Sequence, residues 1–226
     1  MTELALIVGA GQGLSASLAR LFAKNGIQVA LAARNADKLV SLCTETGATA
    51  HACDATQPDA VAALFESLPA DPSIVVYNAS ARAAGPIAEI DPHAVANAIA
   101  ISAFGGFLVG QQAAKRMLPR KAGNILFTGA SASVKGYVNS AAFAMGKFAL
   151  RGLAQSMARE LAPKGIHVSH FVIDGGIRSV ARPDPANNPD SWLDPDAIAE
   201  AYWQVIRQNR SAWTWEQELR PWTERF

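Results

Sequence analysis

The chain has 226 residues, of which 50% are apolar and 17% charged, with 20 Lys and Arg against 19 Asp and Glu. A net charge of +1 gives no basic excess to hold a phosphate backbone, so we expect no nucleic-acid partner. Two cysteines exclude a disulfide scaffold and a four-cysteine metal site, and we expect no metal. The first residues lack the basic segment of a signal peptide, and no unbroken apolar run approaches about 18 residues. We therefore expect a cytoplasmic protein without a membrane partner.

Short apolar runs rich in β-branched residues alternate with longer Ala- and Leu-rich stretches of helical period. Strands are predicted over residues 4–8, 28–33, 49–53, 73–77, 124–128, 167–173 and 213–219. Helices are predicted near residues 14–25, 36–45, 58–68, 92–117, 140–162 and 195–209. Most of the strands are apolar throughout, which is expected when helices cover both faces of a parallel sheet. We predict a single α/β domain over residues 1–226, doubly wound around a parallel seven-stranded sheet with helices on both faces.

The segment after the sixth strand interrupts this alternation. Residues 183–195 are rich in proline and predict a loop, followed over 196–226 by the last helix, an edge strand and a tail. All five tryptophans lie within the last 35 residues. They pack either within the last helix and edge strand, or at a subunit interface or a site wall, where Trp is enriched.

The first strand runs directly into a Gly-Ala-Gly-Gln-Gly-Leu-Ser segment that opens the first helix. Glycines between a strand and a helix let the backbone turn sharply and approach a ligand, and a helix N-terminus favours a pyrophosphate. The spacing departs from Gly-x-Gly-x-x-Gly because Leu14 takes the third glycine position, and it fits Gly-x-x-x-Gly better. We predict that this loop binds a dinucleotide through Gly9, Gly11, Gln12, Gly13 and Leu14. Ordinary turn glycines are the alternative.

The second strand ends at Arg34 and carries no acid there. Dinucleotide folds that prefer NAD place a carboxylate near this strand end to accept a hydrogen bond from the ribose 2′-hydroxyl. An arginine can instead pair with a 2′-phosphate and stack on adenine. We therefore expect NADP as the cofactor, with NAD possible, and a solvated Arg34 as the alternative.

Polar residues follow the later strands at corresponding positions. Asp54 follows the third strand, and Ser131 and Ser133 follow the fifth. The segments Asn78-Ala79-Ser80 and Asp174-Gly175-Gly176-Ile177, each of which begins with a polar residue, follow the fourth and sixth strands. Phe143 and Lys147 lie at the start of a long predicted helix. With these residues, and above all over residues 123–174, the chain resembles the short-chain dehydrogenase/reductase family along essentially its whole length.

The resemblance implies a Rossmann-like fold, an NADP-dependent oxidoreductase of a small organic substrate (a carbonyl, alcohol or imine), and a homodimer or homotetramer. In that family, the Asp after the third strand contacts adenine, the Asn-Ala segment supports the ribose, and the lysine holds the nicotinamide ribose. The further cofactor contacts that the resemblance implies here are Asp54, Ala55, Asn78, Ala79, Ser80, Lys147, Asp174, Gly175 and Ile177.

The proton-transferring residues of the family carry over only in part. The resemblance places the family tyrosine at Phe143, the lysine at Lys147 and the helix asparagine at Ser102. Its serine falls at Ser131, with Ser133 as the second choice. These catalytic positions lack the phenol that normally gives the substrate oxygen a proton. We therefore expect a non-standard proton route.

Three such routes are open at this point. In the first route, Tyr137 moves in from its loop and supplies the phenol. In the second, Lys147 donates a proton to the substrate through a water that Ser131 holds. In the third, the substrate needs no strong acid, as when the hydride goes to an iminium carbon. A catalytically impaired dinucleotide-binding sensor or partner subunit is the alternative to an enzyme, and an oligomeric scaffold with an empty pocket is the third. The resemblance also places the family's substrate loop at the proline-rich residues 183–195, so we expect these residues to shape substrate specificity.

Overall fold

The computed structural model describes residues 3–224, so the end positions of the predicted domain, 1–2 and 225–226, lie outside the described residues. The strands are β1 (Leu4–Val8), β2 (Gln28–Ala33), β3 (Thr49–Ala52), β4 (Ile74–Tyr77), β5 (Gly123–Thr128), β6 (Ile166–Ile173) and β7 (Glu216–Leu219). The helices are α1 (Leu14–Lys24), α2 (Val40–Thr46), α3 (Pro58–Glu66), α4 (Pro92–Ile99), α5 (Gly105–Met117), α6 (Ala141–Leu161) and α7 (Pro195–Ile206).

All seven strands pair in parallel, in the order β3-β2-β1-β4-β5-β6-β7, which confirms the predicted seven-stranded doubly wound sheet. The chain builds outward from β1 to β3 and then returns to place β4 on the other side of β1. The direction of winding thus reverses between β1 and β4. In an open parallel sheet, this reversal leaves a crevice at the carboxyl ends of the strands where ligands bind.

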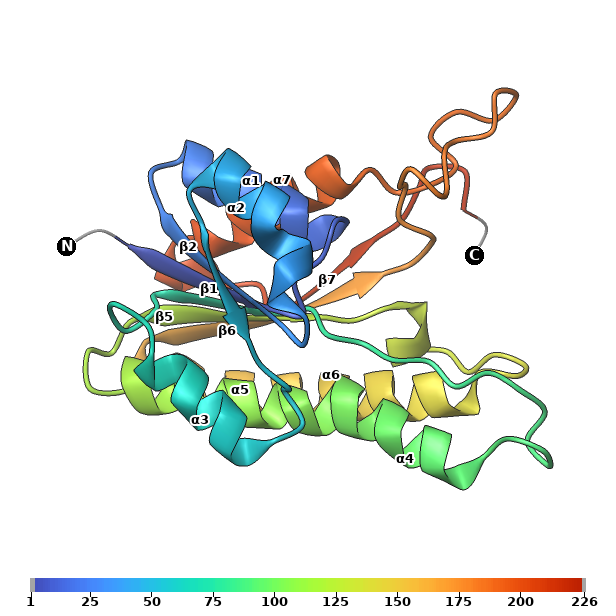
Figure 1. Cartoon of the computed structure of the whole chain (residues 1–226), viewed down its shortest axis with the longest axis horizontal. Coiled ribbons are helices and arrows are strands. Elements are labelled where there is room, and N and C mark those ends of the chain that lie inside the picture. Colours follow the sequence, from blue (N-terminus) through green and yellow to red (C-terminus); the bar gives the residue numbers. More distant parts are fainter. Residues whose placement is uncertain (1–2, 225–226) are drawn as a thin grey trace.

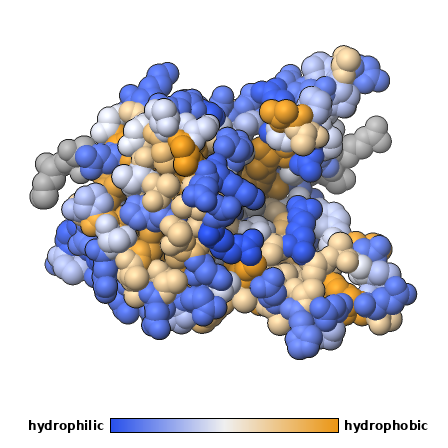
Figure 2. All heavy atoms as spheres, viewed as in Figure 1, coloured by the Kyte–Doolittle hydropathy of each residue, from blue (hydrophilic) through white to orange (hydrophobic). Residues whose placement is uncertain are grey.

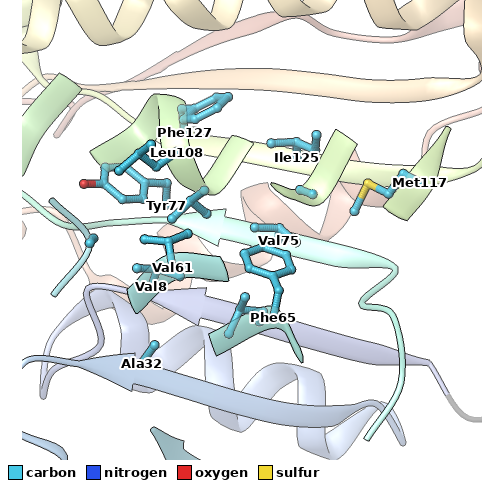
Figure 3. Packing of buried hydrophobic residues seen from close by; sticks show 14 of the residues in the cluster. Val8, Ala32, Val61, Phe65, Val75, Tyr77, Leu108, Met117, Ile125 and Phe127 are labelled. Atoms are coloured by element: carbon cyan, nitrogen blue, oxygen red, sulfur yellow. The ribbon is translucent and has the colours of Figure 1, made fainter. Parts of the chain in front are cut away.

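Helices α1, α2 and α7 cover one face of the sheet, and α3 to α6 cover the other (Figure 1). In β1, Leu4, Leu6 and Val8 pack into the core under α3, α5 and α6, whereas Ala5 and Ile7 pack into the core under α1 and α7. Figure 3 shows the first of these cores. Because successive side chains point to opposite faces, a strand between two helical layers must be apolar at every position, as the sequence is.

The last strand is shorter than predicted. β7 covers Glu216–Leu219, whereas the sequence predicts residues 213–219. The ring of Trp213 stacks on His167 at 4.6 Å between centroids, and the carbonyl of Trp215 accepts a hydrogen bond from the His170 amide at 2.8 Å. The tryptophan segment is therefore fixed by side-chain stacking on β6 before regular strand pairing begins.

The predicted helix 92–117 is a continuous helical stretch with a π-helical turn, Ala100–Phe104, between α4 and α5. An 18-residue window in this stretch has a mean hydropathy of 1.5, enough by length and composition to cross a membrane, although the stretch is not an unbroken apolar run. This window is 39% buried, and α4 and α5 pack on α6 and on the sheet. The apolar character thus serves in part the packing of a core helix.

Candidate functional site

A cavity of about 660 Å³ opens at the carboxyl ends of β1, β2, β3 and β4, where the winding reverses. The space-filling view shows a hollow between the two layers with hydrophilic residues at its rim (Figure 2). The predicted cofactor residues that line the cavity are Gly9, Gly11, Gln12, Arg34, Asp54, Ala55, Asn78, Ala79 and Ser80. Residues 33, 35, 38, 53, 56 and 101 also line it, although the sequence did not assign them.

The remaining predicted cofactor residues are not among those that line this cavity. Gly13 and Leu14 form the start of α1. Asp174 and Gly175 follow β6, and the Asp174 carboxylate pairs with Lys135 at 3.5 Å and Arg220 at 3.2 Å. Ile177 bridges to Leu193 at the base of the 183–195 loop.

The glycine loop is locked to the end of β4. Gly9 has a φ of +83°, and a Cβ there would collide with the backbone nitrogen of Ala79. The Ser15 hydroxyl donates to the Gly9 carbonyl at 3.2 Å and accepts from the Asn78 amide at 2.7 Å. Only glycine permits this approach, and the Asn78–Ser15 bond holds the loop and the first turn of α1 in one geometry.

Arg34 and Asp54 stand on the cavity wall at the ends of β2 and β3. Both side chains are exposed, and within residues 3–224 Arg34 makes no ion pair or hydrogen bond. Asp54 accepts from the amide and the hydroxyl of Thr56 at 2.9 and 2.8 Å, and these bonds, with a smaller contribution from Arg34, lower the pKa of its carboxyl. The wall thus carries one uncommitted cation and one firmly ionised acid.

Lys147 is buried on α6, with 2% of its surface exposed. Its Nζ donates to the carbonyl of Thr128, the last residue of β5, at 2.8 Å. Burial, and to a lesser degree the nearby Arg82 guanidinium, lowers the pKa of Lys147 to about 7. An amine with a pKa near 7 exchanges a proton readily at neutral pH.

Phe143 lies one helical turn before Lys147 and is buried, with 8% exposed. Its ring has the Lys147 Nζ 5.9 Å from its centroid, and the guanidinium carbon of Arg82 lies over it at 4.1 Å. Arg82 comes from the segment after β4. No pattern in the sequence pointed to Arg82, because nothing local links that segment to α6.

The two candidate serines have different surroundings. Ser133 is fully buried, and its Oγ accepts from the Ala130 amide at 3.1 Å and lies 3.3 Å from Nε2 of His170. Ser131 is half-buried in the same turn, which packs on α6, and within residues 3–224 its hydroxyl makes no hydrogen bond. Only Ser131 therefore keeps a hydroxyl for a ligand.

Behind this turn lies a buried polar network that the sequence did not predict. Nδ1 of His170 lies 3.0 Å from the Glu216 carboxylate, which pairs with Arg151 through two hydrogen bonds of 2.6 and 2.7 Å. Burial lowers the pKa of His170 to about 4, against the opposing effect of Glu216, so the ring is neutral near pH 7. The Ser133–His170–Glu216 order is that of a nucleophilic triad. Because Ser133 and His170 are both fully buried, no substrate reaches them, and the network instead fixes the turn that carries Ser131.

Ser102 lies in the π-helical turn and is fully buried. Its hydroxyl accepts from the Ala81 amide at 3.3 Å and lies 3.5 Å from the Ala81 carbonyl. A Cβ at Gly146 would lie 2.8 Å from the Cβ of Ser102, so α6 approaches the turn closely. Ser102 therefore connects α6 to the backbone next to Arg82. Mid-helix π turns often mark functional sites.

The doubly wound sheet, the glycine loop at its first crossover and the crevice at its point of reversal define a dinucleotide-binding α/β protein. The sequence model of the family described as short chain dehydrogenase matches residues 3–182. The chain belongs to this family, whose members are NAD(P)-dependent oxidoreductases, so the expected class is confirmed. The 183–195 loop lies beyond the matched residues.

Individual relatives agree with this assignment. A short-chain dehydrogenase from Rhodopseudomonas palustris has a TM-score of 0.86 at 36% identity, covering 97% of this chain and 99% of that one. A metagenomic short-chain oxidoreductase in complex with NADP has a TM-score of 0.84 at 27% identity, covering 97% of each chain. Short chain aldehyde dehydrogenase 1 of Euphorbia lathyris is 29% identical over 178 residues, 74% of this chain but only 61% of that relative. The chain thus spans less than two thirds of this curated relative.

Proposed function

We propose that the protein is an NADP-dependent oxidoreductase that acts on a small organic substrate by a proton route without a tyrosine. One observation carries the proposal: the crevice at the switch point gathers the glycine loop, Asn78 and an uncommitted Arg34 into one cavity. The metagenomic relative with NADP supports the choice of cofactor.

The residues of the cavity fit an NADP molecule. A Cβ at Gly11 or Gly13 would meet no atom within 4 Å, so this side of the loop is open to a pyrophosphate. The first turn of α1 offers backbone N–H groups from Gly13 and Leu14. Arg34 supplies the cation that a 2′-phosphate needs and a guanidinium plane that can stack on adenine. Asp54 and Ala55 line the same cavity, and we assign to Asp54 the adenine contact that the family makes with this acid. We assign Ser80, Lys147, Asp174, Gly175 and Ile177 to the nicotinamide half, as the resemblance to the family implies.

We place Phe143 at the position of the family tyrosine. A bound nicotinamide coenzyme supplies or accepts a hydride. A phenyl ring holds the shape of the pocket but has no proton to give. Lys147 is the ionisable group beside it, and its pKa of about 7 suits it to donate a proton through a water. Ser131 keeps a free hydroxyl to hold that water or the substrate oxygen.

Two further assignments depend on the loops. Tyr137 is half exposed in the segment before α6, so this phenol is a less suitable donor than Lys147 unless that segment moves. Residues 183–195 project from the carboxyl side of the sheet (Figure 1) and are proposed to shape specificity within a single domain. The proposed location is the cytoplasm.

The proposed assembly is a homodimer, through the outer faces of α4, α5 and α6, or a homotetramer built from such dimers. Exposed apolar side chains gather there: Phe104, Phe107, Met145 and Phe148. The first two rings stack at 6.2 Å between centroids, and these residues remain 44% and 42% exposed. A second copy presenting the same face would cover this patch symmetrically.

The cofactor assignment is tested by titrating the purified protein with NADPH and NADH and following nicotinamide fluorescence. We expect NADPH to bind more tightly, because Arg34 pairs with the 2′-phosphate. Arg34→Asp should reverse the preference. Arg159→Asp, which alters an arginine outside the cavity, is the matched control and should leave it unchanged. Equal affinities for both coenzymes in the wild type would reject the role of Arg34.

A further inference from the structure

The segment that follows β4 carries a cation that the proposed proton route does not use. Arg82 is exposed, and its guanidinium lies over the ring of Phe143. Within residues 3–224 it makes no hydrogen bond and no ion pair. The ring contact engages its positive charge and consumes none of its five N–H donors.

The backbone on both sides of Arg82 is held by hydrogen bonds. Its neighbour Ala81 is held through its amide by the buried hydroxyl of Ser102. Further along the same segment, the Gly85 amide donates to the Asn139 carbonyl at 3.1 Å, which joins it to the segment before α6. The guanidinium is therefore presented by an anchored stretch of backbone and not by a free loop.

The charge around this position is unbalanced. Arg82 and Lys147 lie on the same phenyl ring, at 4.1 and 5.9 Å, and the two cations repel each other. The carboxylates of the same segment do not pair with Arg82. Asp91 accepts from the amides of His93 and Ala94 at the start of α4, and among the described residues Glu89 forms no ion pair. Asp174 is already paired with Lys135 and Arg220.

We propose that Arg82 binds the carboxylate of the substrate, so that the pocket takes small oxo- or hydroxy-acids in preference to neutral ketones and alcohols. A guanidinium matches a carboxylate through two parallel N–H···O bonds, which an ammonium cannot reproduce. The bound anion also offsets the repulsion between Arg82 and Lys147. This inference rests on the proposed function, since it names the substrate class of that same pocket.

The test compares two probes of the same shape and different charge, phenylglyoxylate and its primary amide. Binding is measured by calorimetry, at low salt, to the protein alone and to the protein saturated with oxidised NADP, so that no turnover occurs. We expect the wild type to bind the acid at least about tenfold more tightly than the amide, as for one charge-assisted pair. Arg82→Met should abolish this margin and leave the amide affinity unchanged. Arg82→Lys should retain part of it.

Arg207 provides a matched control, because it also lies over an aromatic ring, Trp203, at 5.5 Å, but at the end of α7. Arg207→Met should keep the full preference for the acid. Equal binding of acid and amide by the wild type, or a preference that survives Arg82→Met, would overturn the inference.

The same samples separate this inference from the proposed function. A titration with oxidised NADP reports the cofactor site independently of Arg82. If oxidised NADP binds and the acid is not preferred, the substrate class is wrong and the cofactor assignment stands. If oxidised NADP does not bind, the proposed function fails, and the measurement on the protein alone still decides whether Arg82 recognises a carboxylate.

Discussion

At the scale of single residues, the pocket combines a buried amine with an aromatic ring that cannot exchange a proton. Lys147 keeps a backbone partner, the Thr128 carbonyl, while burial brings its pKa to about 7. Phe143 fills the space next to it and carries the Arg82 guanidinium on its face. In the proposed mechanism, Phe143 maintains the shape of the pocket, Lys147 donates the proton, and Arg82 binds the charged group of the substrate.

Phe143→Tyr restores a phenol beside Lys147. We expect carbonyl reduction with NADPH to rise by about 10²-fold to 10⁴-fold, the usual value of a positioned general acid. Initial rates with a panel of oxo-acids and ketones measure the gain. Phe148→Tyr, on the exposed side of the same helix, should give none. No gain in Phe143→Tyr with NADPH bound would favour a dinucleotide-binding sensor over an enzyme.

The proton route through Lys147 predicts a pH dependence. If the protonated amine is the acid, kcat for reduction falls about tenfold per pH unit above about 7, where the amine loses its proton. In Lys147→Arg, the side chain stays protonated, so the break near 7 should disappear even where the rate is lower. A break that persists unchanged in Lys147→Arg would assign the proton to another group.

At the scale of elements, the turn between β5 and α6 depends on groups brought from three other segments. Ser133 of this turn meets His170 of β6, which meets Glu216 of β7, which pairs with Arg151 of α6. A Cβ at Gly129 would collide with the His170 ring, so the start of the turn also requires a glycine. The turn that presents Ser131 is therefore held by tertiary contacts.

This network predicts how stability depends on pH. The pKa of His170 falls from 6.5 to about 4 on folding, so the unfolded chain binds more protons between these values. The stabilisation is present above pH 6.5 and is lost as the pH falls towards 4, by on the order of 3 kcal/mol. Urea unfolding at pH 7 and 4.5 measures the loss, which His170→Gln should reduce. The exposed His93→Gln is the control and should lose as much stability as the wild type.

At the scale of the whole molecule, the two helical layers differ in what they leave exposed. The layer of α3 to α6 exposes the stacked rings of Phe104 and Phe107. In the opposite layer, α2 exposes one large apolar side chain, Val40. A contiguous apolar patch needs cover, and a single exposed side chain does not. The proposed dimer buries the patch on the layer of α3 to α6 and leaves the crevice at the carboxyl ends of the strands open.

The proposed dimer makes a prediction about its interface. Phe107→Glu places a charge in the centre of the patch, so we expect a shift from dimer to monomer in sedimentation velocity at micromolar concentration. Val40→Glu, a change of the same kind on α2, should leave the dimer intact. A monomeric wild-type protein under the same conditions would contradict the proposed interface.

Much of this architecture follows from the sequence. The strand β1 is apolar at all five positions, which by itself predicts burial on both faces, and the glycine loop after it marks the first crossover. Two features were not predictable, because they accompany contacts between remote segments. Next to the shorter β7, Trp213 stacks on His167. In the π turn at Ala100–Phe104, the Ile101 carbonyl accepts a hydrogen bond from the Tyr77 hydroxyl. The resemblance to the dehydrogenase family named Phe143 and Lys147, but not Arg82.

The sequence alone determined the winding of the sheet and the place of the nucleotide crevice, because apolar periodicity and turn glycines act over a few neighbouring residues. Only the tertiary structure decided which side chains meet in the pocket. Arg82 on Phe143, Ser102 on Ala81 and His170 between Ser133 and Glu216 join segments remote in the chain. Such contacts form only because the packed layers set the positions of the loops in space. No local pattern of residues encodes how close two remote segments come to each other.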